Sequence, residues 1–298
     1  MKKTSSITIG KMAYDWLSDS KIVTVTGTTS SGTFLRTIEG KIVFLTTSLH
    51  YGPVNLIFEN NFPPNWKNGD LLQVSRGQNS IIFDLQNEKY VLQIKSIWET
   101  PPTPEKTISS EEQFSRIHQA AQQLSILKDG EGLAPLLIPY IDKKTPLKFD
   151  SEWINSMWLE IHELRKAIKA KNVTQINFFA SQLIGSGRGL TPSGDDLLSG
   201  LFFMHQRWFQ DADWFNGLKA PLIEEFNQKT TAVSSTLFYC ATIGEADFRI
   251  QEMADVLMNG ELGMQSQAIN LARWGNSSGA DIFLGMVLAI DCFQENKG

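Results

Sequence analysis

The spacing of hydrophobic and polar positions changes once along the chain. Up to about residue 98, short runs of β-branched and aromatic residues alternate with turn residues such as Gly, Asn and Asp, which is typical of β-strands. Beyond residue 104, large apolar residues recur three or four positions apart, as they do on the buried face of a helix. The pattern predicts strands first and helices afterwards.

Two domains are predicted from this change. The expected strands lie at residues 22–26, 33–37, 41–45, 54–58, 71–74, 81–83 and 90–94. Residues 100–104 read Thr-Pro-Pro-Thr-Pro, which continues neither a strand nor a helix. We therefore predict an α+β fold, with a β-rich domain over residues 1–104 and a mostly α-helical domain over residues 105–298. The β-rich domain is expected to form a small antiparallel β barrel or sandwich.

The helical domain is expected to hold a series of amphipathic helices. Ser109, followed by two glutamates, is typical of a helix N-cap. The helices are predicted at residues 109–127, 154–168, 174–184, 193–210, 218–226, 230–243, 249–258, 261–274 and 278–293, with a connector at 129–146. No internal repeat is visible at a fixed period.

One polar loop interrupts the helical pattern. Residues 185–196 read Gly-Ser-Gly-Arg-Gly-Leu-Thr-Pro-Ser-Gly-Asp-Asp and join two apolar segments. Glycines let the backbone approach a ligand, and a helix start offers N–H groups and a dipole that attract an anion. The loop therefore predicts a site for phosphate or a carboxylate. Its candidate substrate-binding residues are Gly187, Arg188, Gly189, Ser193 and Gly194, and its candidate catalytic residues are Thr191, Asp195 and Asp196.

The acidic pair at the end of this loop has more than one possible use. Asp195 or Asp196 is expected to accept a proton or to hold a divalent cation such as Mg²⁺. A structural alternative is that Ser193 caps the next helix together with an acidic residue three positions on. The loop does not match the P-loop, which requires lysine where Asp195 stands. It does not match the dinucleotide fingerprint either, which requires its third glycine where Leu190 stands.

A second turn has the same order of residue types. Residues 274–281 read Trp-Gly-Asn-Ser-Ser-Gly-Ala-Asp and precede the last predicted helix. Ser277, Ser278 and Asp281 are expected to form the opposite wall of one binding pocket for a small anion. Thr230 is a further candidate, since it opens another helix. The alternative is that Thr230 and one of the two serines act only as helix caps.

Composition limits the classes of function. The net charge of -5 argues against a nucleic-acid surface, and the four histidines show no metal-ligand spacing. Cys240 and Cys292 lie inside apolar helical segments, which indicates reduced thiols in a cytoplasmic protein. The start of the chain lacks a secretory h-region, and the longest apolar run, residues 282–290, is too short to cross a bilayer. We expect no membrane role.

Three stretches together resemble a known family, the one that includes the third subunit of bacterial oxamate carbamoyltransferase. They are residues 187–196, the turn at 275–281 and the pair Thr230-Thr231. Residues 51–55 and the boundary from Trp98 to Pro101 are similar as well, so the resemblance covers nearly the whole chain. Members of that family often carry proline at the position of Arg188.

The resemblance implies a subunit of a carbamoyltransferase of anaerobic allantoin degradation, a branch of purine catabolism. The implied reaction interconverts oxalurate plus phosphate with oxamate plus carbamoyl phosphate. Its ligands would be these small anions, and its partners other carbamoyltransferase subunits. One alternative is a non-catalytic assembly subunit of such a complex. A metal-dependent phosphoryl-transfer enzyme is another alternative, based on Asp195 and Asp196 beside a glycine loop.

Overall fold

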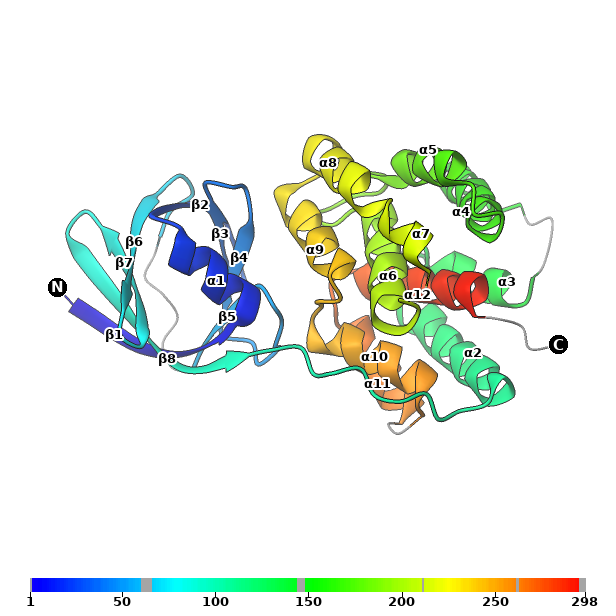
Figure 1. Cartoon of the computed structure of the whole chain (residues 1–298), viewed down its shortest axis with the longest axis horizontal. Helices are drawn as coiled ribbons and strands as arrows, with labels where there is room; N and C mark the ends of the chain where they lie inside the picture. The colour runs from blue at the N-terminus through cyan, green and yellow to red at the C-terminus, as the bar shows by residue number, and fades with distance from the viewer. Residues whose placement is uncertain (1, 60–65, 144–147, 211, 261–262, 295–298) are drawn as a thin grey trace. The chain divides into compact units, whose positions relative to one another are not determined.

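The chain forms two compact units, Met1–Pro101 and Pro102–Gly298, which are described separately (Figure 1). The computed structural model describes residues 2–59, 66–143, 148–210, 212–260 and 263–294. Each unit has its own hydrophobic core, and no residue belongs to both cores. The domain boundary placed between residues 104 and 105 stays a prediction.

The first unit is a closed barrel of eight strands within the described residues. The strands follow the order β1-β5-β4-β3-β2-β6-β7-β8 around the barrel. Alternate side chains point inward, and Ile7, Leu35, Leu45, Leu56 and Phe83 are among those that fill the interior. The bounds are β1 (Lys2–Gly10), β2 (Ile22–Thr29), β3 (Gly32–Thr37), β4 (Ile42–Thr46), β5 (Asn55–Phe58), β6 (Leu71–Gly77), β7 (Ser80–Leu85) and β8 (Glu88–Trp98).

This topology corrects the predicted fold class, because the unit is neither an antiparallel barrel nor a sandwich. Strand β1 pairs in parallel with β8, and β4 pairs in parallel with β5. The pairing of β1 with β8 joins the two ends of the sheet and closes it. The sequence pattern did not predict β1, because its first five residues are all polar. Its inward-pointing apolar side chains, Ile7 and Ile9, come only afterwards.

A helix, α1 (Lys11–Asp19), follows β1 directly and was also missed. The change of direction occurs at Gly10, where a Cβ atom would lie 2.1 Å from the carbonyl oxygen of Gly52. The helix is fixed by a hydrogen bond of 2.9 Å from the Ala13 N–H to the Pro53 carbonyl oxygen. Ala13 and Leu17 then join the barrel core.

The second unit is helical throughout its described residues. Ser109 caps α2 as predicted, since its hydroxyl accepts from the Glu112 N–H at 3.1 Å. The segments η1 and α3 lie in the predicted connector, of which residues 144–147 are outside the described part, as are residues 261–262 of a predicted helix. The bounds are α2 (Ser110–Leu127), η1 (Ala134–Leu136), α3 (Leu137–Ile141), α4 (Glu152–Lys169), α5 (Val173–Leu183), α6 (Ser193–Trp208), α7 (Asp213–Asn216), α8 (Lys219–Lys229), α9 (Ala232–Thr242), α10 (Phe248–Met258), α11 (Met264–Ala272) and α12 (Ser278–Phe293).

Helices α6 and α12 form the centre of this unit. They pack against each other, and the other helices lie around them (Figure 1). Both are buried over nearly their whole length, which explains why they are apolar on all sides. Among the residues described, no helix is long and apolar enough to span a membrane. The predicted glycine turns therefore lie at the starts of the two most buried helices.

Candidate functional site

The two central helices begin with the same pattern, Ser-Gly-x-Asp-x-x-x-Gly. The pattern covers residues 193–200 and 278–285. A Cβ atom on Gly200 would lie 2.1 Å from the Ile282 carbonyl oxygen, and one on Gly285 would lie 2.0 Å from the Leu197 carbonyl oxygen. Leu197 and Ile282 hold the same place in the pattern, so the contact between the helices is reciprocal. The two helix starts are thus related by an approximate two-fold axis.

The aspartate of α6 reaches the start of α12. Asp196 is 3% exposed, and the nearby hydroxyls of Ser278 and Thr191 act on its carboxyl group to lower its pKa. The same two hydroxyls lie 3.0 Å from each other. Thr191 and Ser278 are therefore brought together with Asp196, as the prediction of one shared pocket requires.

The aspartate of α12 makes the corresponding contacts with the start of α6. Asp281 is 0% exposed, and the nearby hydroxyls of Ser277 and Ser193 act on its carboxyl group to lower its pKa. Its Oδ1 atom also accepts a hydrogen bond of 2.7 Å from the Leu133 N–H. Each of the two pattern serines thus interacts with the carboxyl group of the opposite helix, which couples the two starts.

Burial makes the charged forms of both carboxyl groups unfavourable. It raises the pKa of Asp281 to about 7, although the Leu133 N–H and the hydroxyls of Ser277 and Ser193 act in the opposite direction. Burial is also the main cause that raises the pKa of Asp196 well above its usual 3.8, and the negative charge of Asp281 adds to it. The site therefore contains two buried carboxyl groups that repel each other when both are ionised.

Asp195, the third carboxylate, is occupied by the protein itself. Its Oδ1 atom accepts from the Gly185 N–H at 2.7 Å, and its Oδ2 atom accepts from the Ser234 hydroxyl at 2.6 Å and from the Thr230 hydroxyl. Burial raises the pKa of Asp195, while these three hydrogen bonds lower it. Asp195 thus ties the glycine loop to α9, and both of its oxygens accept hydrogen bonds from the chain itself.

The glycine loop is exposed above these buried groups. Gly185, Gly187 and Gly189 adopt φ angles of 77°, 120° and 95°, which residues other than glycine rarely adopt. A Cβ atom on Gly187 would also lie 2.5 Å from the Ser193 nitrogen. Arg188 is exposed and forms no hydrogen bond or ion pair with any residue that the structure describes. The geometry therefore gives no role to Arg188 within the chain.

The alternative that Ser193, Ser277 and Thr230 act as helix caps is wrong. Ser193 is the first residue of α6, and the N-cap, Pro192, makes no side-chain capping bond. Ser277 holds the N-cap position of α12 but also makes no capping bond. Thr231, rather than Thr230, caps α9, and its hydroxyl accepts from the Ser234 N–H at 3.0 Å. The hydroxyls of Ser193, Ser277 and Thr230 face carboxyl groups instead.

Three backbone N–H groups in the first turn of each central helix are already bonded. The Gly194 N–H donates to the Ser186 carbonyl oxygen at 2.9 Å, and those of Asp195 and Asp196 donate to Pro192 at 2.9 Å and 3.1 Å. The corresponding N–H groups of α12 are bonded in the same way. Hydroxyl and carboxyl groups, rather than first-turn amides, therefore dominate the site, and anion binding by Gly194 stays a prediction.

The sequence analysis missed three groups of this site: the Ser234 hydroxyl, the Leu133 N–H and the close contact at Gly200. The contact at Gly200 had a signal, because the eight-residue pattern recurs at α6 and α12. The other two had none, since α9 and the segment before η1 meet the site only through tertiary packing. Gly132 beside Leu133 has no room for a Cβ atom, which would lie 2.6 Å from Oδ1 of Asp281.

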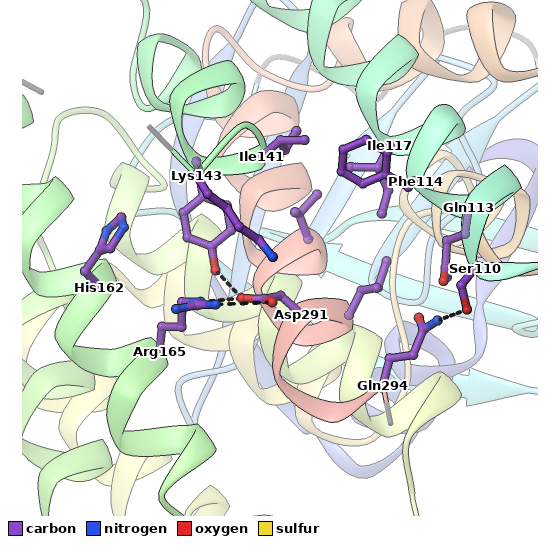
Figure 2. Close-up of a pocket in the computed structure, with 13 residues that line it drawn as sticks. Ser110, Gln113, Phe114, Ile117, Ile141, Lys143, His162, Arg165, Asp291 and Gln294 are labelled. Atoms are coloured by element: carbon purple, nitrogen blue, oxygen red, sulfur yellow. Dashed lines mark hydrogen bonds and ion pairs between the residues drawn. The ribbon is translucent and has the colours of Figure 1, made fainter. Parts of the chain in front are cut away.

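A separate cavity of about 380 Å³ lies near the other end of α12 (Figure 2). Many of its polar side chains are bonded to one another. Asp291 accepts from Arg165 and, at 3.4 Å, from the Tyr140 hydroxyl, and Gln294 donates to Ser110 at 3.3 Å. None of the predicted site residues lines it. The paired helix starts, with their incompletely bonded carboxyl groups, are the better candidate for chemistry.

The part of the chain that carries both helix starts is similar to a family of carbamoyltransferase subunits. The family model described as oxamate carbamoyltransferase subunit AllH matches residues 183–290, which confirms the family indicated by the sequence motifs. The matched segment contains every predicted site residue and leaves residues 1–182 uncovered. Searches among curated proteins and among solved structures gave no match.

Proposed function

We propose that this chain is a subunit of a carbamoyltransferase and that the paired starts of α6 and α12 form a substrate site. The reaction would convert oxalurate and phosphate into oxamate and carbamoyl phosphate, and the reverse. The observation that supports the site is the reciprocal contact of Asp196 and Asp281 with the opposite helix. This arrangement lies entirely inside the segment that matches the AllH family model.

The chemistry of this reaction suits the arrangement. A phosphate oxygen attacks the carbamoyl carbon of oxalurate, the bond from that carbon to the bridging nitrogen breaks, and the nitrogen gains a proton. Negative charge develops on the carbamoyl oxygen as the bond to phosphate forms. Thr191 and Ser277 are half-buried hydroxyls beside the exposed glycine loop. We assign them as donors to this oxygen, since fixed donors can lower such a barrier by several kcal/mol.

The test is the rate of carbamoyl phosphate formation by the assembled enzyme with Thr191→Val. This substitution removes the hydroxyl but keeps the shape, and we expect kcat to fall about 100-fold, the usual effect of losing one such donor. Thr242→Val is the matched control, because that hydroxyl only bonds to the Tyr239 carbonyl oxygen within its helix. An unchanged kcat with Thr191→Val, in a complex of normal size by gel filtration, contradicts the assignment.

A non-catalytic assembly subunit is the second candidate. It is supported by the first-turn N–H groups of residues 194–196 and 279–281, which are bonded within the chain, and by Asp195, both of whose oxygens accept hydrogen bonds from the chain itself. Calorimetric titration of the assembled complex with phosphate, oxamate and carbamoyl phosphate separates the two candidates. Heat that disappears with Thr191→Val supports a substrate site, whereas heat that is unaffected favours assembly.

A further inference from the structure

Two buried oxygen atoms at the paired helix starts have no hydrogen-bond partner. They are the Oδ2 atoms of Asp196 and Asp281, which belong to side chains that are 3% and 0% exposed. A charged oxygen that is buried and unbonded is strongly unfavourable unless a cation or a proton neutralises it. Both atoms sit on carboxyl groups that interact electrostatically with each other. A single cation that binds both oxygens would neutralise the pair.

No basic side chain supplies the compensating charge. In the part of the chain that the structure describes, neither Asp196 nor Asp281 forms an ion pair with Lys or Arg. Glu131 and Asp195 add further negative charge, and Lys128 donates instead to the Gly275 carbonyl oxygen at 3.3 Å. The anionic substrates of the proposed function would be repelled by such a site.

We propose that Asp196 and Asp281 together bind one divalent cation, Mg²⁺, at the junction of the two helix starts. Mg²⁺ prefers oxygen ligands and is commonly held by one or two carboxylates, with waters and substrate phosphate completing its shell. The two unbonded Oδ2 atoms provide the protein ligands. The contact of the bound cation with phosphate or oxamate rests on the proposed function, but the cation site itself does not.

Asp195 is a poorer ligand than Asp196, because neither of its oxygens is free of hydrogen bonds. Both of its oxygens accept hydrogen bonds from Gly185, Thr230 and Ser234. Within the described residues, no cluster of three or more His, Cys, Asp or Glu could hold a metal ion. The site therefore has two carboxylate ligands, which suits a hydrated Mg²⁺ and not a fully protein-bound ion such as structural zinc.

The test uses Mn²⁺ as a paramagnetic substitute for Mg²⁺ on the full chain without substrate. Electron paramagnetic resonance of free Mn²⁺ should show one bound ion per chain, displaced by Mg²⁺. Asp196→Asn and Asp281→Asn should each raise the Kd for Mn²⁺ by 100-fold or more, since each removes one of two charged ligands. Asp291→Asn, at the other end of α12, is the control and should leave the Kd unchanged. Far-UV circular dichroism establishes that each variant is folded.

A second measurement needs no substitution. Fe²⁺ bound in place of Mg²⁺, with ascorbate and peroxide, should cut the wild-type backbone near residues 191–196 and 277–281, as read by mass spectrometry. The proposal is overturned if wild-type protein binds no Mn²⁺ at millimolar concentration, if both Asn variants keep wild-type affinity, or if cleavage falls elsewhere. Mn²⁺ binding without carbamoyl phosphate formation by the complex would count against the proposed function alone.

Discussion

Asp195 and Asp196 are neighbours in sequence but have opposite surroundings. Asp195 accepts three hydrogen bonds from its own chain, whereas Asp196 keeps one oxygen unbonded. The sequence analysis treated the two as interchangeable, because a helix start places both in the first turn and does not show which one faces inward to α9. The structure separates them into a residue that fixes the loop and a residue available to a ligand.

We expect Asp195→Ala to destabilise the protein strongly. The substitution leaves the Gly185 N–H and the hydroxyls of Thr230 and Ser234 without their acceptor, which should cost about 3 kcal/mol or more. The measurement is the free energy of unfolding in urea. Glu225→Ala is the control, because its ion pair with Lys229 is partly exposed, and such a pair is worth about 1 kcal/mol or less. Equal losses for both variants would show that Asp195 does not fix the loop.

The burial of His205 predicts that the stability of the protein depends on pH. The residue is 0% exposed, and burial, followed by the positive charge of Lys219, lowers its pKa from 6.5 to about 4. The folded protein therefore holds His205 neutral at pH values where the unfolded chain already binds a proton. Its contribution to stability is complete above pH 6.5 and is lost as the pH falls towards 4, by about 3 kcal/mol in total.

His205→Phe should remove this dependence, since a phenyl ring fits between the rings of Phe215 and Phe293. The quantity to measure is the difference in unfolding free energy between wild type and variant at several pH values from 4 to 7. Asp281, with its raised pKa, also makes stability depend on pH, but in the opposite direction. Because this contribution is present in both proteins, it cancels in the difference. A difference that does not vary over this range would exclude a buried neutral His205.

At the scale of elements, the contact between α6 and α12 depends on glycine. We expect Gly285→Ala to force the helices apart, because the new Cβ atom would lie 2.0 Å from a backbone oxygen that cannot rotate away. Overpacking of this kind costs about 1–3 kcal/mol or more. It should also weaken Mn²⁺ binding, since Asp196 and Asp281 would separate. The measurements are thermal unfolding and the Kd for Mn²⁺.

Gly217→Ala is the matched control for this substitution. Gly217 has a φ angle of -64°, and its added Cβ atom would lie 3.6 Å from the Trp214 carbonyl oxygen, an ordinary contact. Alanine at such a position changes stability by about 1 kcal/mol or less. If Gly285→Ala were as harmless as Gly217→Ala, the helices could not be in close contact through their glycines.

The elements differ in how far sequence could predict them. All seven predicted strands coincide with strands of the barrel, because alternation and turn residues are local signals. The position of the glycine loop before α6 was predictable for the same reason. The roles of Ser193 and Thr230 were not predictable, because their hydroxyls interact with Asp281 and Asp195 across the tertiary structure and do not cap a helix.

At the scale of the whole molecule, local signals were insufficient for the barrel. The fold class predicted for it was wrong, because the barrel has two parallel pairings, β1 with β8 and β4 with β5. Such pairings depend on which strands meet and not on the residues of any one strand. The candidate site was anticipated as two facing glycine turns. The two-fold relation, and the identity of the two unbonded carboxyl groups, required the packing of α6 against α12.

The pairing of β1 with β8 has a consequence for the order of folding. During synthesis β1 leaves the ribosome first, and the barrel closes only after β8, which ends at Trp98, has followed. Contacts between such distant segments form late, because the intervening chain must first be ordered. Until then β1 and β8 each present an unpaired edge that another nascent chain can bind. The interval between the synthesis of β1 and that of β8 is thus one in which the barrel segment is exposed to aggregation.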